Sequence, residues 1–161
     1  MEILLGQLQH PLVLSLLTEH QQDMALHSPP ESVHALDVSG LAAKEVTFWS
    51  VWQNNQHHPR FQAAQLAGCG ALKELDLTHG EIKSMRTASQ FLRQGVAQML
   101  LNHIIAEARN RGYKKLSLET GSMAAFLPAK RLYEQFGFIE CEPFADYKPD
   151  PYSVFLTLAL S

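Results

Sequence analysis

One stretch of sequence decides the fold of this chain: Arg93-Gln94-Gly95-Val96-Ala97-Gln98-Met99-Leu100-Leu101. From here onward the apolar residues Val96, Leu100, Ile104 and Ala108 recur every four positions, the spacing of one face of an α-helix. Gly112 follows the two arginines of the last turn and predicts where the helix ends, because glycine readily takes left-handed backbone angles. The stretch therefore predicts the start of a long amphipathic helix.

A strand is predicted just before this helix, over residues 81–87, and residues 88–92 form the loop between the two. The first turn of a helix carries unpaired backbone N–H groups and a partial positive charge, so it binds phosphate well. Gly95 and the small Ala97 let a ligand approach the backbone, and Arg93 adds a charged, forked donor. Such a junction is also ordinary architecture, and it matches neither the P-loop nor the dinucleotide-binding pattern.

The first 40 residues predict one strand and two helices. Residues 1–8 are a short strand, and helical spacing of leucines after His10-Pro11 predicts a helix towards Ala25. Prolines followed by an acid predict a second, short helix over residues 32–36, which the Ser-Gly pair at 39–40 closes.

The remaining segments alternate between strands and one further helix. Residues 46–52 and 65–72 predict an antiparallel pair joined by a polar loop over 53–64, and a turn at 78–80 leads into the strand at 81–87. After the long helix follow a strand, a helix and two strands, at residues 115–119, 125–136, 138–141 and 153–158. The order β-α-α-β-β-β-α-β-α-β-β predicts a mixed α/β domain.

The composition is that of an ordinary globular chain. With 161 residues, 46% of them hydrophobic, we expect one domain over residues 1–161. The net charge of −3 disfavours nucleic acid as a partner, because binding phosphates needs a basic face. Two cysteines without a zinc-type pattern predict neither a disulfide framework nor a metal site. An acid at position 2 and the lack of a long apolar run favour a cytoplasmic protein without a membrane partner.

Two segments in order resemble the GNAT superfamily of acetyltransferases. Residues 85–120 resemble its acyl-CoA-binding segment, and Ala129-Lys130-Arg131-Leu132-Tyr133-Glu134-Gln135-Phe136-Gly137-Phe138 is similar to its C-terminal signature A-x-x-L-Y-x-x-x-G-F. The family's loop usually begins with Gln or Arg, whereas this chain has Leu92 there and Arg93 one position later. Ala97 meets the last position of that motif. The resemblance implies a mixed, mostly antiparallel sheet of about six or seven strands, flanked by about four helices.

The resemblance also implies acetyl-CoA as co-substrate. Main-chain amides from Arg93 to Ala97 then hold the pyrophosphate, and an N–H near Met85 or Arg86 polarises the thioester carbonyl. The residues expected to bind acetyl-CoA are Met85, Arg86, Thr87, Leu92, Arg93, Gln94, Gly95, Val96, Ala97, Gln98, Glu119, Thr120, Ala129 and Arg131.

Catalytic roles follow from the same resemblance. Tyr133 is expected to protonate the departing thiolate, although its place beside Leu132 and Phe136 also suits a core aromatic. Glu81 stands where some members carry a glutamate base, and strand alternation puts it on one face with Lys83 and Met85. A solvated carboxylate is the alternative for Glu81.

Glu119, at the end of the next strand, is the second candidate base, although an ordinary charge at a strand end explains it too. Lys83, Arg86 and residues 28–34 are candidates for the pocket of the acceptor, whose identity the sequence does not give.

Three functions remain in competition. The first is transfer of an acetyl group to the amine of a small molecule, amino acid or peptide. The second is a catalytically silent acyl-CoA sensor, and the third, a nucleotide-binding module, lacks a Walker-type lysine. A homodimer is possible through Val154-Phe155-Leu156, but these residues suit an internal strand equally well.

Overall fold

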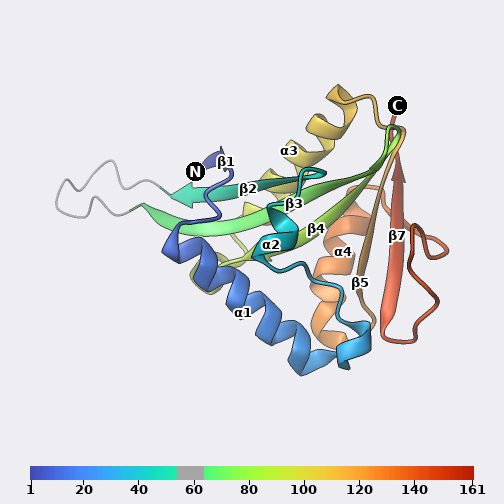
Figure 1. Cartoon of the computed structure of the whole chain (residues 1–161), viewed down its shortest axis with the longest axis horizontal. Coiled ribbons are helices and arrows are strands. Elements are labelled where there is room, and N and C mark those ends of the chain that lie inside the picture. Colours follow the sequence, from blue (N-terminus) through green and yellow to red (C-terminus); the bar gives the residue numbers. More distant parts are fainter. Residues whose placement is uncertain (54–63) are drawn as a thin grey trace.

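The computed structural model describes residues 1–53 and 64–161 (Figure 1). In that part of the chain seven strands form one sheet in the order β1-β2-β3-β4-β5-β7-β6. Neighbouring strands are antiparallel except for the parallel pair β4–β5. The strands are β1 (Glu2–Leu5), β2 (Val46–Gln53), β3 (Gln65–Asp76), β4 (His79–Thr87), β5 (Lys115–Gly121), β6 (Ile139–Glu140) and β7 (Ser153–Ala159).

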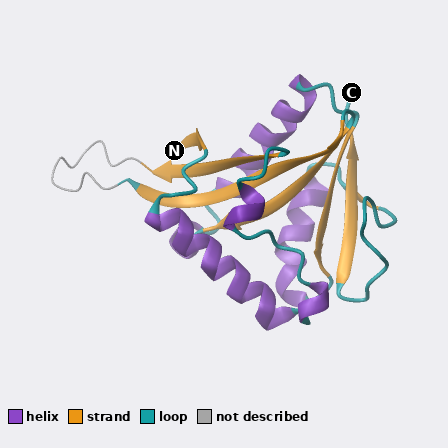
Figure 2. Cartoon of the chain, viewed as in Figure 1, coloured by secondary structure: helices purple, strands orange, loops and turns teal. Residues whose placement is uncertain are grey.

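Helices cover both faces of this sheet (Figures 1 and 2). The described helices are α1 (Pro11–His27), α2 (Val38–Leu41), α3 (Val96–Asn110) and α4 (Leu127–Gln135). In Figure 1, α1 and α2 lie in front of the strands, and α3 and α4 lie behind them. The order of elements and the mixed, mostly antiparallel sheet with four helices confirm the predicted fold class.

The long helix α3 forms as the sequence predicts. Its stripe of apolar residues is buried, and both of its ends carry a glycine with φ of 82°, Gly95 before the first turn and Gly112 after the last. Leucine and isoleucine side chains of this stripe fill the core beneath β3, where Gly70 leaves room for Leu100 and Ile104. The start of α3 is thereby fixed against the sheet.

Helix α1 is defined by local signals at each end. The His10 side chain accepts a hydrogen bond from the Leu12 N–H at 3.1 Å, and Pro11 occupies the first helical position. At the other end Ser28 has extended backbone angles and two prolines follow, which stop the helix. The helix buries Val13, Leu16, Leu17 and His20.

An opening between β4 and β5 positions the site. The two parallel strands pair over three residues of each, His79–Glu81 with Lys115–Ser117, and then diverge (Figure 1). Beyond this point each strand keeps its other neighbour, because β3 pairs along β4 up to Thr87 and β7 pairs along β5 up to Gly121. A gap therefore opens in the middle of the sheet, directly beside the start of α3.

A bulge in β4 overturns one expectation about side-chain direction. Ser84 has a positive φ of 55°, and the pairing of β3 with β4 skips from Ala71–Lys83 to Cys69–Arg86. One extra residue in a strand reverses the faces of all residues after it. Met85 therefore points towards α3, where its sulfur approaches Gly70, so the prediction that it shares a face with Glu81 and Lys83 is wrong.

Other local predictions were wrong as well. Residues 33–37 are not helical: a 3₁₀ turn at Pro30–Ser32 and α2 lie on either side, and the Ser-Gly pair at 39–40 lies inside α2. Asp37 starts α2, because its carboxylate accepts from the Gly40 N–H at 2.7 Å. The turn predicted at 78–80 lies at 77–78 instead, and residues 79–80 already belong to β4. Most of the loop predicted over 53–64 lies outside the described residues.

The C-terminal strand β7 has neighbours on both sides. It pairs with β5 along its whole length and with β6 at Leu156 and Thr157. Of the two interpretations of this segment, an internal strand is the one confirmed. Within the described residues, none of the helices is both long and apolar enough to cross a bilayer.

Candidate active site

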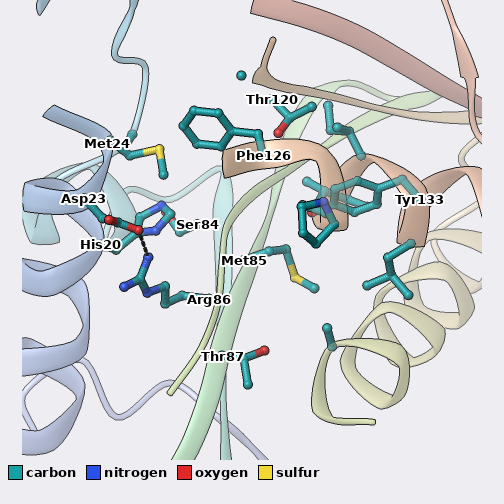
Figure 3. Close-up of a pocket in the computed structure, with 18 of the residues that line it drawn as sticks. His20, Asp23, Met24, Ser84, Met85, Arg86, Thr87, Thr120, Phe126 and Tyr133 are labelled. Atoms are coloured by element: carbon teal, nitrogen blue, oxygen red, sulfur yellow. Dashed lines mark hydrogen bonds and ion pairs between the residues drawn. The ribbon is translucent and has the colours of Figure 1, made fainter. Parts of the chain in front are cut away.

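A cleft of about 970 Å³ runs through the gap between β4 and β5 (Figure 3). Its walls come from α1, β4, the start of α3, the end of β5, α4 and the loop before β7. Of the site residues predicted from the sequence, all but Gln94 line this cleft: Glu81, Met85, Arg86, Thr87, Leu92, Arg93, Gly95, Val96, Ala97, Gln98, Glu119, Thr120, Ala129, Arg131 and Tyr133. The Gln94 amide donates instead to the carbonyl of Gln90 at 3.1 Å.

The start of α3 forms one end of the cleft. Gly95 is its N-cap, and within the described chain no side chain caps the first amides of this helix. The space in front of Gly95 is open, because a Cβ built there meets nothing closer than the Gln98 side chain at 4.0 Å. Arg93, with a positive φ of 61°, and Arg131 line the same cleft. This end therefore offers open amides and two cations to an anionic ligand.

The middle of the cleft holds Tyr133 and Met85 (Figure 3). Tyr133 is 7% exposed and packs edge-on against Phe138, with ring centroids 5.6 Å apart. Burial raises the pKa of Tyr133, so the phenol keeps its proton at neutral pH. Tyr133 is a core aromatic that also lines the cleft, and its role as a proton donor stays a prediction.

A hydrogen-bonded trio of Glu81, Lys83 and Tyr147 forms part of the wall of the cleft. The Tyr147 hydroxyl donates to Glu81 at 2.5 Å, and Lys83 lies 3.3 Å from the same carboxylate and 2.9 Å from the Tyr147 oxygen. Glu81 is 2% exposed, so it is a buried ion-paired group and not the solvated carboxylate considered above. Burial and the Glu81 charge raise the pKa of Tyr147, which keeps the phenol protonated as the donor.

Glu119 differs from Glu81 in having spare hydrogen-bonding capacity. Its Oε2 is buried and has no hydrogen-bond partner in the described part of the chain. Burial, opposed by Lys83 and assisted by Glu81 and Asp150, raises the pKa of Glu119 to about 7. This carboxyl group therefore exchanges its proton near neutral pH.

The α1 side of the cleft carries a second charged group. Arg86 donates from Nη1 to Asp23 at 2.7 Å and from Nη2 to Glu19 at 2.9 Å. The hydrogen bond from Arg86 lowers the pKa of Asp23, which therefore stays ionised. Burial and the nearby Arg86 charge lower the pKa of His20 to about 4, so His20 is neutral at physiological pH.

The lining residues that were not predicted from the sequence include His20, Ser84 and Tyr147. His20 carried a usable signal, since it continues the buried stripe Val13, Leu16 and Leu17 on α1. Ser84 and Tyr147 carried none, because a bulge and a contact over 66 positions are not visible in local patterns. Residues 28–34, predicted at the acceptor side, do contribute to the cleft through Ser28, Ser32, Val33 and His34.

Metal ligands are not grouped in this site. Among the described residues, no set of three His, Cys, Asp or Glu side chains is arranged to hold a metal ion.

Comparison with known proteins identifies the family to which this chain belongs. The model of the acetyltransferase (GNAT) family matches residues 14–138. The chain is 57% identical over 160 residues to the uncharacterised N-acetyltransferase YsnE of Bacillus subtilis, covering 99% of this chain and 100% of that protein.

Solved structures agree with this match. A putative acyl-CoA N-acyltransferase from Klebsiella pneumoniae superposes with a TM-score of 0.76 at 27% identity, covering 99% of this chain and 97% of that one. A GNAT acetyltransferase from Elizabethkingia anophelis, solved with acetyl-CoA bound, has the same fold, with a TM-score of 0.66 at 22% identity and coverage of 99% and 97%. This chain therefore belongs to the GNAT family and is an N-acetyltransferase of that family.

Proposed function

We propose that this enzyme transfers the acetyl group of acetyl-CoA to a primary amine of a small molecule, an amino acid or a peptide, by direct attack. One observation carries the proposal: a single cleft joins an uncapped helix start, a gap in the sheet, a protonated phenol and a carboxyl group that titrates near neutral pH. These are the parts that acyl transfer from a thioester to an amine requires.

The open end of α3 supports a diphosphate site. Backbone amides beyond Gly95, assisted by Arg93 and Arg131, offer donors and positive charge at one mouth of the cleft. The acetyl-CoA-bound structure from Elizabethkingia has the same fold, which supports this ligand for the present chain. In this proposal the acyl arm lies in the gap between β4 and β5, and an N–H near Met85 or Arg86 polarises the thioester carbonyl.

We assign the proton donor to Tyr133. It lines the same cleft as the start of α3 and the carboxyl groups of Glu81 and Glu119, and its raised pKa keeps the proton available. A neutral phenol beside the sulfur gives its proton to the thiolate as the carbon–sulfur bond breaks.

Of the two candidate bases, Glu119 is the better supported. The Glu81 carboxylate already accepts from Tyr147 and faces Lys83, whereas Glu119 Oε2 has no partner in the described structure. A base works best when its pKa lies near the working pH, and that of Glu119 is about 7. Glu81 and Lys83 then act as charged neighbours that set the local field.

The proposed transfer forms one carbon–nitrogen bond and breaks one carbon–sulfur bond. The amine nitrogen attacks the thioester carbon, its surplus proton passes to Glu119, directly or through water, and the carbon–sulfur bond breaks. The thiolate of coenzyme A takes the proton of Tyr133, and an acetamide is formed. The proton held by Glu119 then returns through water to the Tyr133 oxygen, which restores the enzyme for the next turnover. No oxidant or reductant is needed.

A catalytically silent acyl-CoA sensor is the competing function. It requires the open start of α3 but has no use for a protonated phenol or for an unpartnered carboxyl group. Both groups lie in the cleft, which favours the enzyme.

The test is a pair of measurements on the purified chain. Calorimetric titration with acetyl-CoA, with ATP as the comparison ligand, should show binding of acetyl-CoA and weaker or no binding of ATP. Release of free thiol is then followed with a panel of primary amines, and at least one amine should accelerate it. Binding without transfer to any amine would favour the sensor, and preference for ATP would reject both functions.

A further inference from the structure

Three buried polar atoms without a hydrogen-bond partner lie along the α1 wall of the cleft. They are His20 Nδ1, Ser84 Oγ and Arg86 Nε, and the described residues offer none of them a partner. His20 is 9% exposed and Ser84 8% exposed, and all three residues line the same cleft. Figure 3 shows His20 and Arg86 on the α1 side, away from Met85 and Tyr133.

Buried polar atoms of this kind indicate that a polar group of a ligand binds beside them. Leaving one buried donor or acceptor unpaired is costly, so native proteins rarely keep several of them together. The β4 bulge at Ser84 is what directs Arg86 to this wall, because it reverses the strand faces just before that residue. The fold has therefore built a polar subsite opposite the site proposed for thioester chemistry.

The hydrogen-bonding chemistry of the three atoms selects the ligand. Arginine only donates, and the other two nitrogens of Arg86 are already used by Asp23 and Glu19, so Nε requires an acceptor oxygen. A serine hydroxyl both donates and accepts. A neutral imidazole offers one donor and one acceptor nitrogen, and His20 is neutral. An amide group, with one carbonyl oxygen and an N–H, satisfies such a set.

Charge argues against a carboxylate in this place. Arg86 contributes one positive charge, and its partners Asp23 and Glu19 contribute two negative charges, so this group carries a net charge of about −1 when His20 and the neighbouring His27 are neutral. A further anion would face the carboxylates of Asp23 and Glu19, and the guanidinium of Arg86 beside them is already ion-paired with both. An uncharged oxygen is accepted without this repulsion.

We propose that His20, Ser84 and Arg86 bind an amide group of the acceptor, so that the substrates are amino-acid amides or the N-terminal end of peptides and not free amino acids. The proposal rests on the proposed acetyl transfer and names its substrate class. In such substrates the reactive amine is separated from the amide carbonyl by one carbon atom.

The experiment compares three matched series of acceptors: amino-acid amides, the corresponding free amino acids, and the amines that lack the carbonyl. We expect kcat/KM to be highest for the amides and lowest for the free acids. In Ser84→Ala the ratio of kcat/KM between amide and matching amine should fall about tenfold, which corresponds to roughly 1.4 kcal/mol. The matched control is Ser39→Ala, an exposed serine outside the cleft, which should keep the wild-type ratio.

Two further measurements identify the occupant. Calorimetric titration of an amino-acid amide into the protein without acetyl-CoA should show binding that Ser84→Ala weakens, and this readout does not depend on turnover. Coenzyme A affinity should be the same in both proteins. If Ser84→Ala instead weakens coenzyme A, the atoms bind an amide of the cofactor arm and the proposal is wrong.

Preference for free amino acids, or an equal loss of rate with all three series, would also overturn the proposal. If some amine is acetylated without any effect of an adjacent amide, the proposed function stands and the substrate class is rejected.

Discussion

The Tyr147 hydroxyl lies 2.5 Å from the carboxylate of Glu81, although 66 positions separate the two residues in the sequence. Tyr147 comes from the loop before β7, and this loop is anchored to the 3₁₀ turn at residues 30–32 by a hydrogen bond from Ser32 to Asp150. The ring of Tyr147 also packs edge-on against His34, with centroids 5.0 Å apart. One side chain thus ties the C-terminal loop to the buried acid of β4.

Removing this hydrogen bond should destabilise the protein. In Tyr147→Phe the ring contacts remain, but the buried Glu81 Oε2 keeps only Lys83, at 3.3 Å, as a donor, and the loss of this hydrogen bond to a charged group costs about 1.5–3 kcal/mol of unfolding free energy. Urea denaturation measures the difference. Tyr152→Phe, which changes a tyrosine that is 40% exposed, is the control and should stay near wild-type stability. Equal stability of the wild type and Tyr147→Phe would show that the contact contributes nothing.

Tyr133→Phe should separate chemistry from binding. Loss of the proton donor is expected to lower kcat by about 100-fold or more, since positioned acids contribute factors of that size. The affinity for coenzyme A should hardly change, because the ring still packs against Phe138. Steady-state kinetics and calorimetry provide the two readouts. A variant with an unchanged kcat would remove Tyr133 from the mechanism.

The activity should depend on pH through Glu119. With a pKa of about 7, its basic form increases as the pH rises from 6 to 8, so kcat/KM should rise over this interval. Glu119→Gln should lose most of the activity together with this rise. If the variant keeps the wild-type profile, another group supplies the base.

Glu119 should also affect stability, in a direction set by its raised pKa. In the unfolded chain the group ionises near pH 4.5, whereas in the folded protein it does so near 7. The folded state therefore holds a proton that the unfolded state has lost, and Glu119 makes stability fall as the pH rises from about 4.5 to 7. Glu119→Gln should consequently raise Tm relative to wild type more at pH 8 than at pH 4.5. Thermal melts of both proteins at pH 4.5 and pH 8 measure this difference. An equal change in Tm at the two pH values would contradict the raised pKa of Glu119.

The two glycines that flank α3 provide a matched pair of variants that tests the proposed diphosphate site. Gly95 and Gly112 both have φ of 82°, so alanine costs about 1–2 kcal/mol of backbone strain at either position. Gly95 lines the cleft and Gly112 does not. Gly95→Ala should therefore weaken acetyl-CoA binding in calorimetry, whereas Gly112→Ala should show the stability loss alone. Comparable affinity in the two variants would place the diphosphate elsewhere.

The sequence was sufficient for most elements and for the residues that line the cleft at the start of α3. The stripe Val96, Leu100, Ile104 and Ala108 fixes α3 by its period, and Gly95 and Gly112 fix its ends by their backbone freedom. The residues of this unit that line the cleft were predicted together, because they are neighbours along the chain.

The failures have physical causes. The helix expected over residues 32–36 had proline and acid in suitable positions, but Asp37 caps the next turn instead and the helix forms at α2. The direction of Met85 was wrong because alternation assumes an unbroken strand, and the bulge at Ser84 breaks it. Residues 79–80 pair with both β3 and β5, and Asp76 accepts from the Thr78 N–H at 2.8 Å, so the turn closes before His79 and not at the predicted position.

What the sequence determined by itself is the set of units and their order, since periodicity, caps and glycine angles act between residues a few positions apart. The side-chain contacts that line the cleft were decided by the tertiary structure alone. Arg86 meets Asp23 and Glu19 across more than 60 positions, and Tyr147 meets Glu81 across 66. Such contacts, and the burial that raises the pKa of Glu119, exist only after the sheet has opened between β4 and β5 and the loops have closed around the gap.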